Sequence, residues 1–181
     1  MPDRLYVPLA EGDLRIEPLA EHHREGLRAA TAADSEIWAI YPYSYEGEYF
    51  DPAFGVLLAA PPRRRVYAVL VEDRIVGMTA WIERGDSGWA IEIGNTYLEP
   101  SMRGTGLNAR LKRLMLDHAF SCGLKRVEFR VDVRNARSQA AVLKLGAKKE
   151  GVLRAERITW TGHVRDTAVF SILAEEWAER S

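Results

Sequence analysis

The chain has 181 residues, a formal charge of −1 at pH 7, and a composition that is 47% hydrophobic and 28% charged. This balance is typical of a folded globular protein and excludes the disordered, collagen-like and disulfide-scaffold classes. Because no overall basic field exists, we expect no nucleic-acid partner and no charge-driven membrane binding. At roughly 150 residues per domain, residues 1–181 are expected to form a single domain.

The chain carries few metal-binding side chains, with one cysteine, Cys122, and four histidines. One cysteine cannot form an intrachain disulfide, and the histidines lack the spacing of metal ligands, so we predict no metal site. No apolar run approaches the ~18 residues of a membrane span, and the first residues do not resemble a signal peptide. We therefore expect a cytoplasmic protein.

The N-terminal part of the chain predicts a strand and two helices with an aromatic segment between them. Residues 14–19 alternate as a strand does, and helical spacing follows over residues 20–30. A second helix is predicted over residues 46–60, ended by Pro61-Pro62 because proline lacks the amide that a helix needs. The aromatic segment, residues 37–45, is too apolar for an exposed loop, so we expect it to act as a lid.

The middle of the chain predicts three consecutive antiparallel strands over residues 66–72, 75–84 and 89–98, because short runs rich in Val, Ile, Trp and Tyr are joined by turns at 72–74 and 85–88. A long amphipathic helix follows from Leu107 and stops before Gly123. Its spacing places Leu107, Leu111, Leu114, Met115 and Ala119 on one face, and Arg110, Lys112 and Arg113 on the other.

The last third predicts a strand over residues 126–133, a helix over 138–145, and two final strands over 151–160 and 165–173. Asn135 is a plausible N-cap of the helix, and Gly146 its C-cap. A run of hairpin strands combined with a crossover helix indicates an α+β fold with a mixed sheet.

The most informative motif joins the third middle strand to the long helix. Here Gly104 and Gly106 leave backbone amides bare at a helix N-terminus, where the helix dipole adds about half a positive charge. Arg103 and Arg110 add formal charge at the same end. The motif indicates an anion cradle, although a Gly-x-Gly pair is also found in ordinary turns. Walker and dinucleotide-binding loops are excluded, since neither Gly-Lys-Ser/Thr nor a third glycine follows.

Three separated stretches resemble the GNAT acetyltransferases. Residues 101–106 lie where this family carries Gln/Arg-x-x-Gly-x-Gly/Ala, and residues 130–154 and 165–173 resemble its RimJ/RimL branch. The resemblance covers about residues 14–177. It implies a GNAT-like fold, with a mixed, mostly antiparallel sheet whose central strands splay apart and whose two faces carry helices. It also implies acetyl-CoA as donor and an amine as acceptor.

Carried onto this sequence, the resemblance implies that the backbone of residues 102–107 wraps the pyrophosphate of acetyl-CoA. Ser101 replaces the usual Gln/Arg, which removes a long side chain but no backbone donor. The end of the strand at residues 97–98 would pair with the pantetheine arm. Asn135 matches an asparagine that contacts pantetheine, and as an N-cap it can serve both roles. The predicted cofactor-binding residues are Tyr97, Leu98, Met102, Arg103, Gly104, Thr105, Gly106, Leu107, Asn135 and Ser138.

Two residues are catalytic candidates, Glu92 and Ser138. Many relatives protonate the departing thiolate with a tyrosine where this chain has Val142, and a serine is proposed for that role in the RimJ/RimL branch. A hydroxyl is a poor acid, so Ser138 is expected to orient water or donate a hydrogen bond. The acceptor amine must lose a proton before it attacks, and Glu92 faces the cleft if strand alternation holds. A bulge near Gly94 would reverse that facing, and a paired structural carboxylate is the alternative.

Six aromatic residues are candidates for the wall of an acceptor cleft: Trp38, Tyr41, Tyr43, Tyr45, Trp81 and Trp160. Aromatic residues are more often simply core. The RimJ/RimL resemblance favours a protein N-terminal α-amine as acceptor, while relatives acetylate polyamines and antibiotics. A non-catalytic acyl-CoA-binding module is a further alternative, since Val142 replaces the usual acid. Edge strands and an apolar C-terminal hairpin permit a homodimer.

Overall fold

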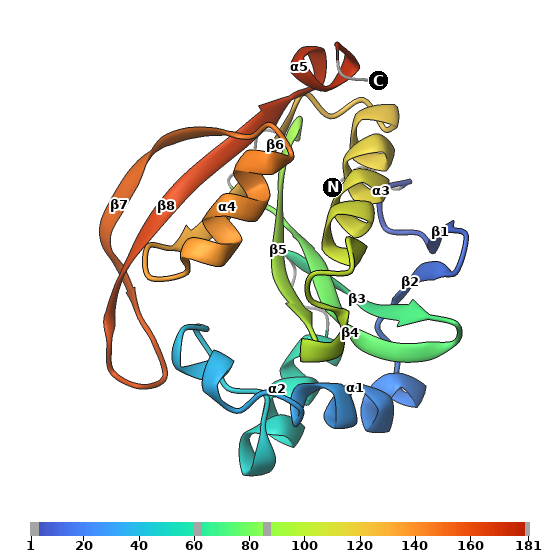
Figure 1. The fold of residues 1–181 in the computed structure, drawn as a ribbon, viewed down its shortest axis with the longest axis vertical. Coiled ribbons are helices and arrows are strands. Elements are labelled where there is room, and N and C mark those ends of the chain that lie inside the picture. Colours follow the sequence, from blue (N-terminus) through green and yellow to red (C-terminus); the bar gives the residue numbers. More distant parts are fainter. Residues whose placement is uncertain (1–3, 60–62, 85–87, 180–181) are drawn as a thin grey trace.

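The computed structural model describes residues 4–59, 63–84 and 88–179 (Figure 1). The N-terminal elements are β1 (Leu9–Glu11), β2 (Leu14–Pro18), α1 (Arg24–Thr31), α2 (Phe50–Leu58), β3 (Arg64–Val71), β4 (Arg74–Ile82) and β5 (Ala90–Leu98). The remaining elements are α3 (Leu107–Ser121), β6 (Arg126–Asp132), α4 (Ala136–Lys144), β7 (Lys148–Ile158), β8 (Val164–Leu173) and α5 (Ala174–Ala178). The predicted breaks at Pro61-Pro62 and at residues 85–87 lie outside the described residues.

The strands form one eight-stranded sheet in the order β1-β2-β3-β4-β5-β6-β8-β7. Neighbouring strands are antiparallel throughout the described sheet, except that β5 and β6 run parallel. This confirms the predicted α+β class and the mixed, mostly antiparallel sheet. Two short elements, β1 and α5, were not predicted, because three and five residues are too few to display a hydrophobic period.

Helices cover both faces of the sheet, as predicted. On one face α3 and α4 contribute Leu111, Met115 and Val142 to a large apolar cluster. On the other face α1 and α2 contribute Leu27 and Phe54 to a second cluster. Figure 1 shows α3 and α4 grouped near β5 and β6, with α1 and α2 together at the opposite end of the molecule. The sheet therefore separates two differently lined sides.

The central strands β5 and β6 splay apart along most of their length. They pair only where residues 90–92 meet residues 126–128, whereas β5 continues to Leu98 and β6 to Asp132. Parallel strands that stop pairing leave unpaired backbone groups along both diverging edges. We call the space between them the gap, and Glu92 lies at its closed end.

A β-bulge in β5 changes which side chains face each side of the sheet. The register with β4 shifts between Met78 and Ala80, and Asn95 adopts a left-handed φ of +51°. A bulge places one extra residue in its strand, so the alternation of side chains reverses beyond it. The side chains of Thr96 and Tyr97 therefore face the opposite sides of the sheet from those they would face in a regular strand. Glu92 precedes the bulge, so its side chain keeps the predicted side.

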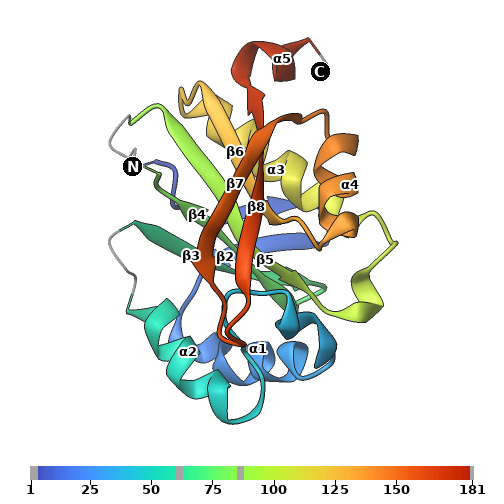
Figure 2. The same cartoon turned by 90° about the vertical axis from the view of Figure 1, so that its left-hand side faces the viewer.

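Two surface features concern partners. No helix among the described residues is long and apolar enough to cross a membrane. The hairpin of β7 and β8 closes one end of the sheet and reaches toward α1 and α2 (Figure 2), and its outer strand exposes Val152, Leu153 and Ile158. An exposed apolar edge strand is a template for pairing with another chain. The homodimer stays a prediction.

Candidate active site

The loop between β5 and α3 has the backbone of an anion cradle. Gly104 and Gly106 adopt left-handed φ values of +78° and +88°, which only glycine tolerates without steric cost. A Cβ at either position would meet nothing within 4 Å, so the backbone conformation and not crowding requires glycine. The amides of Gly104, Thr105 and Gly106 donate to no acceptor among the described residues. These amides stand at the N-terminus of α3, where anions bind favourably.

The side chains of this loop support its shape and leave the amides free. Leu107 is buried, and Met102 packs against the same core cluster. The Thr105 hydroxyl donates to the Met102 carbonyl at 2.8 Å and accepts from the Leu107 amide at 3.3 Å. Only the backbone of these predicted cofactor-binding residues is therefore available to a diphosphate.

Of the two arginines expected to add positive charge at the cradle, only Arg103 stays near it. Arg110 turns away to the β1–β2 hairpin, where it donates to Asp13 at 2.7 Å, because its position on α3 faces that hairpin. Arg103 forms an ion pair with Asp34, which follows α1. Burial raises the pKa of the Tyr41 phenol, and the charges of Arg103 and of Arg137, which lies at the start of α4, act in the opposite direction. Both cations therefore lie near that ring.

The edge of β5 that borders the gap presents unpaired backbone groups. The Glu99 amide donates to a carbonyl of β4 at 2.9 Å, and since amides alternate along a strand, the Leu98 amide points into the gap. The Thr96 carbonyl also points away from β4 and accepts from the Tyr41 hydroxyl. The side chains of Tyr97 and Leu98 are buried, so only their backbone could pair with an amide-containing arm.

The start of α4 borders the gap from the side of β6. Asn135 is the N-cap, as predicted, and its Oδ1 accepts from the Ser138 amide at 3.0 Å. The Asn135 Nδ2 and the Ser138 hydroxyl have no hydrogen-bond partner among the described residues. Both groups can therefore meet a ligand while the cap stays in place. Val142 is buried in the core cluster one turn further along α4.

Glu92 lies at the closed end of the gap and faces away from α3. Its side chain is 4% exposed, forms an ion pair with Arg84, and lies 3.9 Å from Arg130. A Cβ at Gly94 would lie 2.5 Å from the Glu92 carboxylate, so any larger residue at position 94 would clash with this carboxylate. Glu92 therefore keeps the side of the sheet predicted for it and is paired there with arginines, and its catalytic role stays a prediction.

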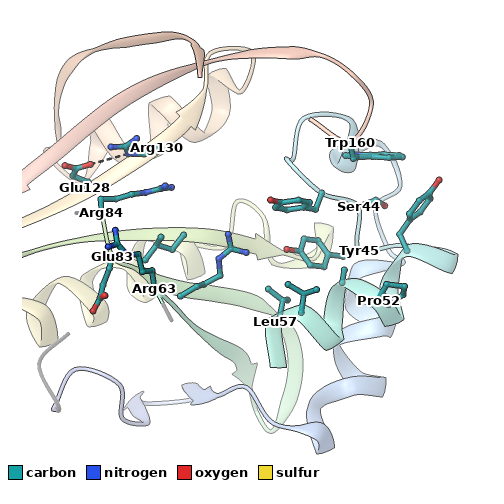
Figure 3. Close-up of a pocket in the computed structure, with 16 residues that line it drawn as sticks. Ser44, Tyr45, Pro52, Leu57, Arg63, Glu83, Arg84, Glu128, Arg130 and Trp160 are labelled. Carbon is teal, nitrogen blue, oxygen red and sulfur yellow. Dashed lines mark hydrogen bonds and ion pairs between the residues drawn. The ribbon is translucent and has the colours of Figure 1, made fainter. Parts of the chain in front are cut away.

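A cavity of about 980 Å³ opens on the Glu92 side of the sheet (Figure 3). Trp160, at the tip of the β7–β8 hairpin, closes it from one side. The Trp160 indole donates to the Trp38 carbonyl at 2.7 Å, and the Trp160 amide donates to the Pro42 carbonyl at 3.1 Å. The other lining residues are Tyr43, Ser44, Tyr45, Tyr49, Pro52, Ala53, Val56, Leu57, Arg63, Arg64, Ile82, Glu83, Arg84, Glu128 and Arg130.

The six aromatic candidates divide between this cavity and the core. Tyr43, Tyr45 and Trp160 line the cavity. Trp38 is buried within the aromatic segment, and Tyr41 borders the gap. Trp81 is fully buried on the α3 face, where its indole meets the Tyr67 hydroxyl at 3.3 Å, so alternation along β4 directs it away from the cavity.

Several cavity residues were not predicted, because they come from separate elements. Tyr49 lies after the aromatic segment, while Arg84 follows β4 and Arg130 lies in β6, distant in sequence. No local pattern marks an arginine that becomes a neighbour of Glu92 only when the sheet forms.

Lys112 lies elsewhere than its helical position suggested. The sequence placed it on the polar face of α3, but it is only 5% exposed and its Nζ donates to the Thr96 hydroxyl at 2.5 Å. Burial lowers the pKa of Lys112 to about 7, although the charge of Glu92 partly offsets this effect. The splayed sheet and α3 together enclose a position that an isolated helix would expose.

Comparisons with known proteins agree with this geometry. The family model described as acetyltransferase (GNAT) domain matches residues 13–148. A structure from T. thermophilus, described as an acetyltransferase, is 33% identical with a TM-score of 0.85, over 96% of this chain and 92% of that chain. No curated protein matches the sequence.

Two more distant structures share the fold. Mycobacterium smegmatis RimJ in complex with CoA-disulfide is 21% identical, with a TM-score of 0.78 over 93% of this chain and 87% of that chain. Spermidine N-acetyltransferase from Vibrio cholerae, in complex with CoA and spermine, is 18% identical, with a TM-score of 0.73 over 93% of this chain and 99% of that chain. At these identities the likeness concerns the fold alone.

Proposed function

Because this chain belongs to the GNAT acetyltransferase family, we propose that it transfers the acetyl group of acetyl-CoA directly to a protein N-terminal α-amine. The enzyme is an acyltransferase, and acetyl-CoA is its donor. One observation carries the proposal: a cradle of free amides and a separate aromatic cavity border one gap in the sheet. Two compartments that meet at a gap suit direct transfer between two bound substrates.

The donor side supplies contacts of the right chemistry for acetyl-CoA. The amides of residues 104–106 donate to no described acceptor and are free to bind the diphosphate, and Arg103 lies in the same loop. The Leu98 amide and the Asn135 Nδ2 offer donors to the amide carbonyls of pantetheine. A thioester carried on that arm would lie along β5 toward the closed end of the gap.

The acceptor side supplies a base. In direct transfer the neutral amine attacks the thioester carbon, and the tetrahedral intermediate expels the thiolate. Glu92 lies on this side and would take the amine proton directly or through water. The hydroxyl of Ser138, free of described partners, would orient a water or donate a hydrogen bond. Holding both substrates in line contributes up to ~7–11 kcal/mol at best.

The charge of the cavity favours an α-amine over a polyamine. Its described lining includes four arginines and two glutamates, and Arg64 forms no ion pair with a described residue. A polycation would meet net positive charge there, whereas a peptide brings one amine together with backbone carbonyls. An α-amine, with a pKa of about 8, is also neutral more often at pH 7.5 than a primary alkylamine near 10.4.

The proposal is tested by measuring CoA release from acetyl-CoA with three acceptor classes: peptides with free N-termini, spermidine and an aminoglycoside. We expect release with peptides, and mass spectrometry should place the acetyl group on the α-nitrogen. Peptides blocked at the N-terminus but containing lysine are the matched control and should be inert. Faster transfer to spermidine or the aminoglycoside would assign a small-molecule acceptor. Tight CoA binding without transfer would indicate a non-catalytic module.

A further inference from the structure

Lys112 is a buried amine whose surroundings do not explain it as a structural cation. Its Nζ has one hydrogen-bond partner, the Thr96 hydroxyl, and forms no ion pair with a described residue. A buried ammonium without a carboxylate partner is costly, because burial disfavours the charged form. A methionine of similar length would fill the same space between α3 and the sheet without that cost.

The position of Lys112 places it beside the gap on the donor side. Thr96 follows the bulge on the splayed part of β5, so its hydroxyl faces α3 while its carbonyl borders the gap. Glu92 stands at the closed end of the same gap on the opposite face. The strand that borders the gap, β5, therefore carries an amine against its α3 face at Thr96 and a carboxylate on its cavity face at Glu92.

We propose, resting on the proposed function, that Lys112 donates the proton that the departing CoA thiolate takes up. When the C–N bond has formed and the C–S bond breaks, the sulfur keeps the electron pair and receives a proton from the Lys112 ammonium. The proton lost by the attacking amine goes to Glu92 or its water and from there to solvent, and solvent returns a proton to the neutral Lys112. The proton balance then closes without any other reactant.

Lys112 is a better acid for this step than the alternatives. With a pKa of about 7 it is more acidic than a thiol near 8.5, so transfer to the thiolate is downhill. Burial raises the pKa of the Tyr41 phenol well above its ordinary value, and Val142 has no acidic proton. Ser138, a hydroxyl, is weaker still and is left with an orienting role.

Few other groups act on Lys112. Glu92 of β5 is the charged residue that affects it, while β4 and β5 present the hydroxyls of Thr79 and Thr96. Within α3 itself, Arg110 turns to Asp13 of the β1–β2 hairpin. The α3-facing residues of β6 are apolar: Val127, Phe129 and Val131. The titration of Lys112 should therefore follow burial and Glu92 alone.

The test compares the pH dependence of kcat in the wild type, Lys112→Met and Lys112→Arg. A general acid must be protonated, so wild-type kcat should fall as pH rises through about 7. Lys112→Met should lose this high-pH fall and roughly 10²-fold of kcat. Calorimetry should show CoA affinity within about three-fold of the wild type. Lys112→Arg keeps the cation but does not release its proton, so it should be as slow as the methionine variant.

A purely structural role for Lys112 gives different results. Lys112→Arg would then recover activity, and Thr96→Val would reproduce the loss seen in Lys112→Met at every pH. An unchanged high-pH fall in an active Lys112→Met enzyme would overturn this proposal and leave the proposed function intact. A wild-type enzyme that binds CoA but transfers to no amine would overturn both.

Discussion

Replacing Gly106 by valine tests whether the loop before α3 binds the diphosphate through its backbone. Gly106 has a φ of +88°, and Gly123, at the other end of the same helix, has a φ of +89°. A Cβ at either glycine would meet nothing within 4 Å. The two positions therefore differ in the function proposed for them and hardly in conformation, which makes Gly123→Val the matched control.

The expected magnitudes follow from the backbone. An L-residue held in the left-handed region costs roughly 1–2 kcal/mol, so both variants should lose a similar free energy of unfolding. Only the change at Gly106 relieves its strain by moving cradle amides. Losing one charge-assisted hydrogen bond costs about 1.5–3 kcal/mol of binding free energy. This loss corresponds to a roughly 10- to 150-fold higher Kd for CoA.

Two measurements decide the result. Urea denaturation should give similar losses of stability in Gly106→Val and Gly123→Val, and calorimetry should show weaker CoA binding only in Gly106→Val. Unchanged CoA affinity in Gly106→Val would remove the cradle from the binding site. Equal weakening in both variants would mean that helix stability, and not the amides, controls affinity.

Three further predictions concern the chemistry and the cavity. Glu92→Gln should lower kcat by roughly 10²-fold and leave CoA affinity unchanged, and a normal pH–rate profile in this variant would assign the base to water. Trp160→Ala removes a wall of the cavity and the hydrogen bond to Trp38, so the KM for a peptide acceptor should rise while the CoA affinity measured by calorimetry stays constant. An unchanged KM would place the acceptor elsewhere. Cys122→Ala should keep turnover within about three-fold, since direct transfer needs no thiol nucleophile, and an inactive variant would contradict direct transfer.

The elements of the fold were predictable because their signals are local. The runs of Val, Ile, Trp and Tyr between turns over residues 66–98, and the helical spacing after Leu107, are each contained within one element. The Asn135 cap and the two loop glycines are likewise fixed by dihedral preferences of single residues. These features needed no knowledge of distant contacts.

The cavity and its charges were less predictable because they depend on strand order. Arg84, Glu92 and Arg130 come from three parts of the chain that become neighbours only when β4, β5 and β6 assemble. The sequence left a bulge near Gly94 open, and only the register with β4 places it at Asn95, where it reverses the facing of the residues beyond it and not that of Glu92. Trp81 and Lys112 were misplaced for the same reason, since their burial is decided by the neighbouring layer.

The sequence by itself determined the positions of the turns, the loop residues with exposed backbone amides, and the apolar side of each helix. These features depend on residues only a few positions apart. Only the tertiary structure decided that Lys112 is buried beside Thr96 while Glu92 meets two arginines on the opposite face. The physical reason is that burial and charge pairing depend on elements far apart in sequence, and an opening in a sheet has no local pattern.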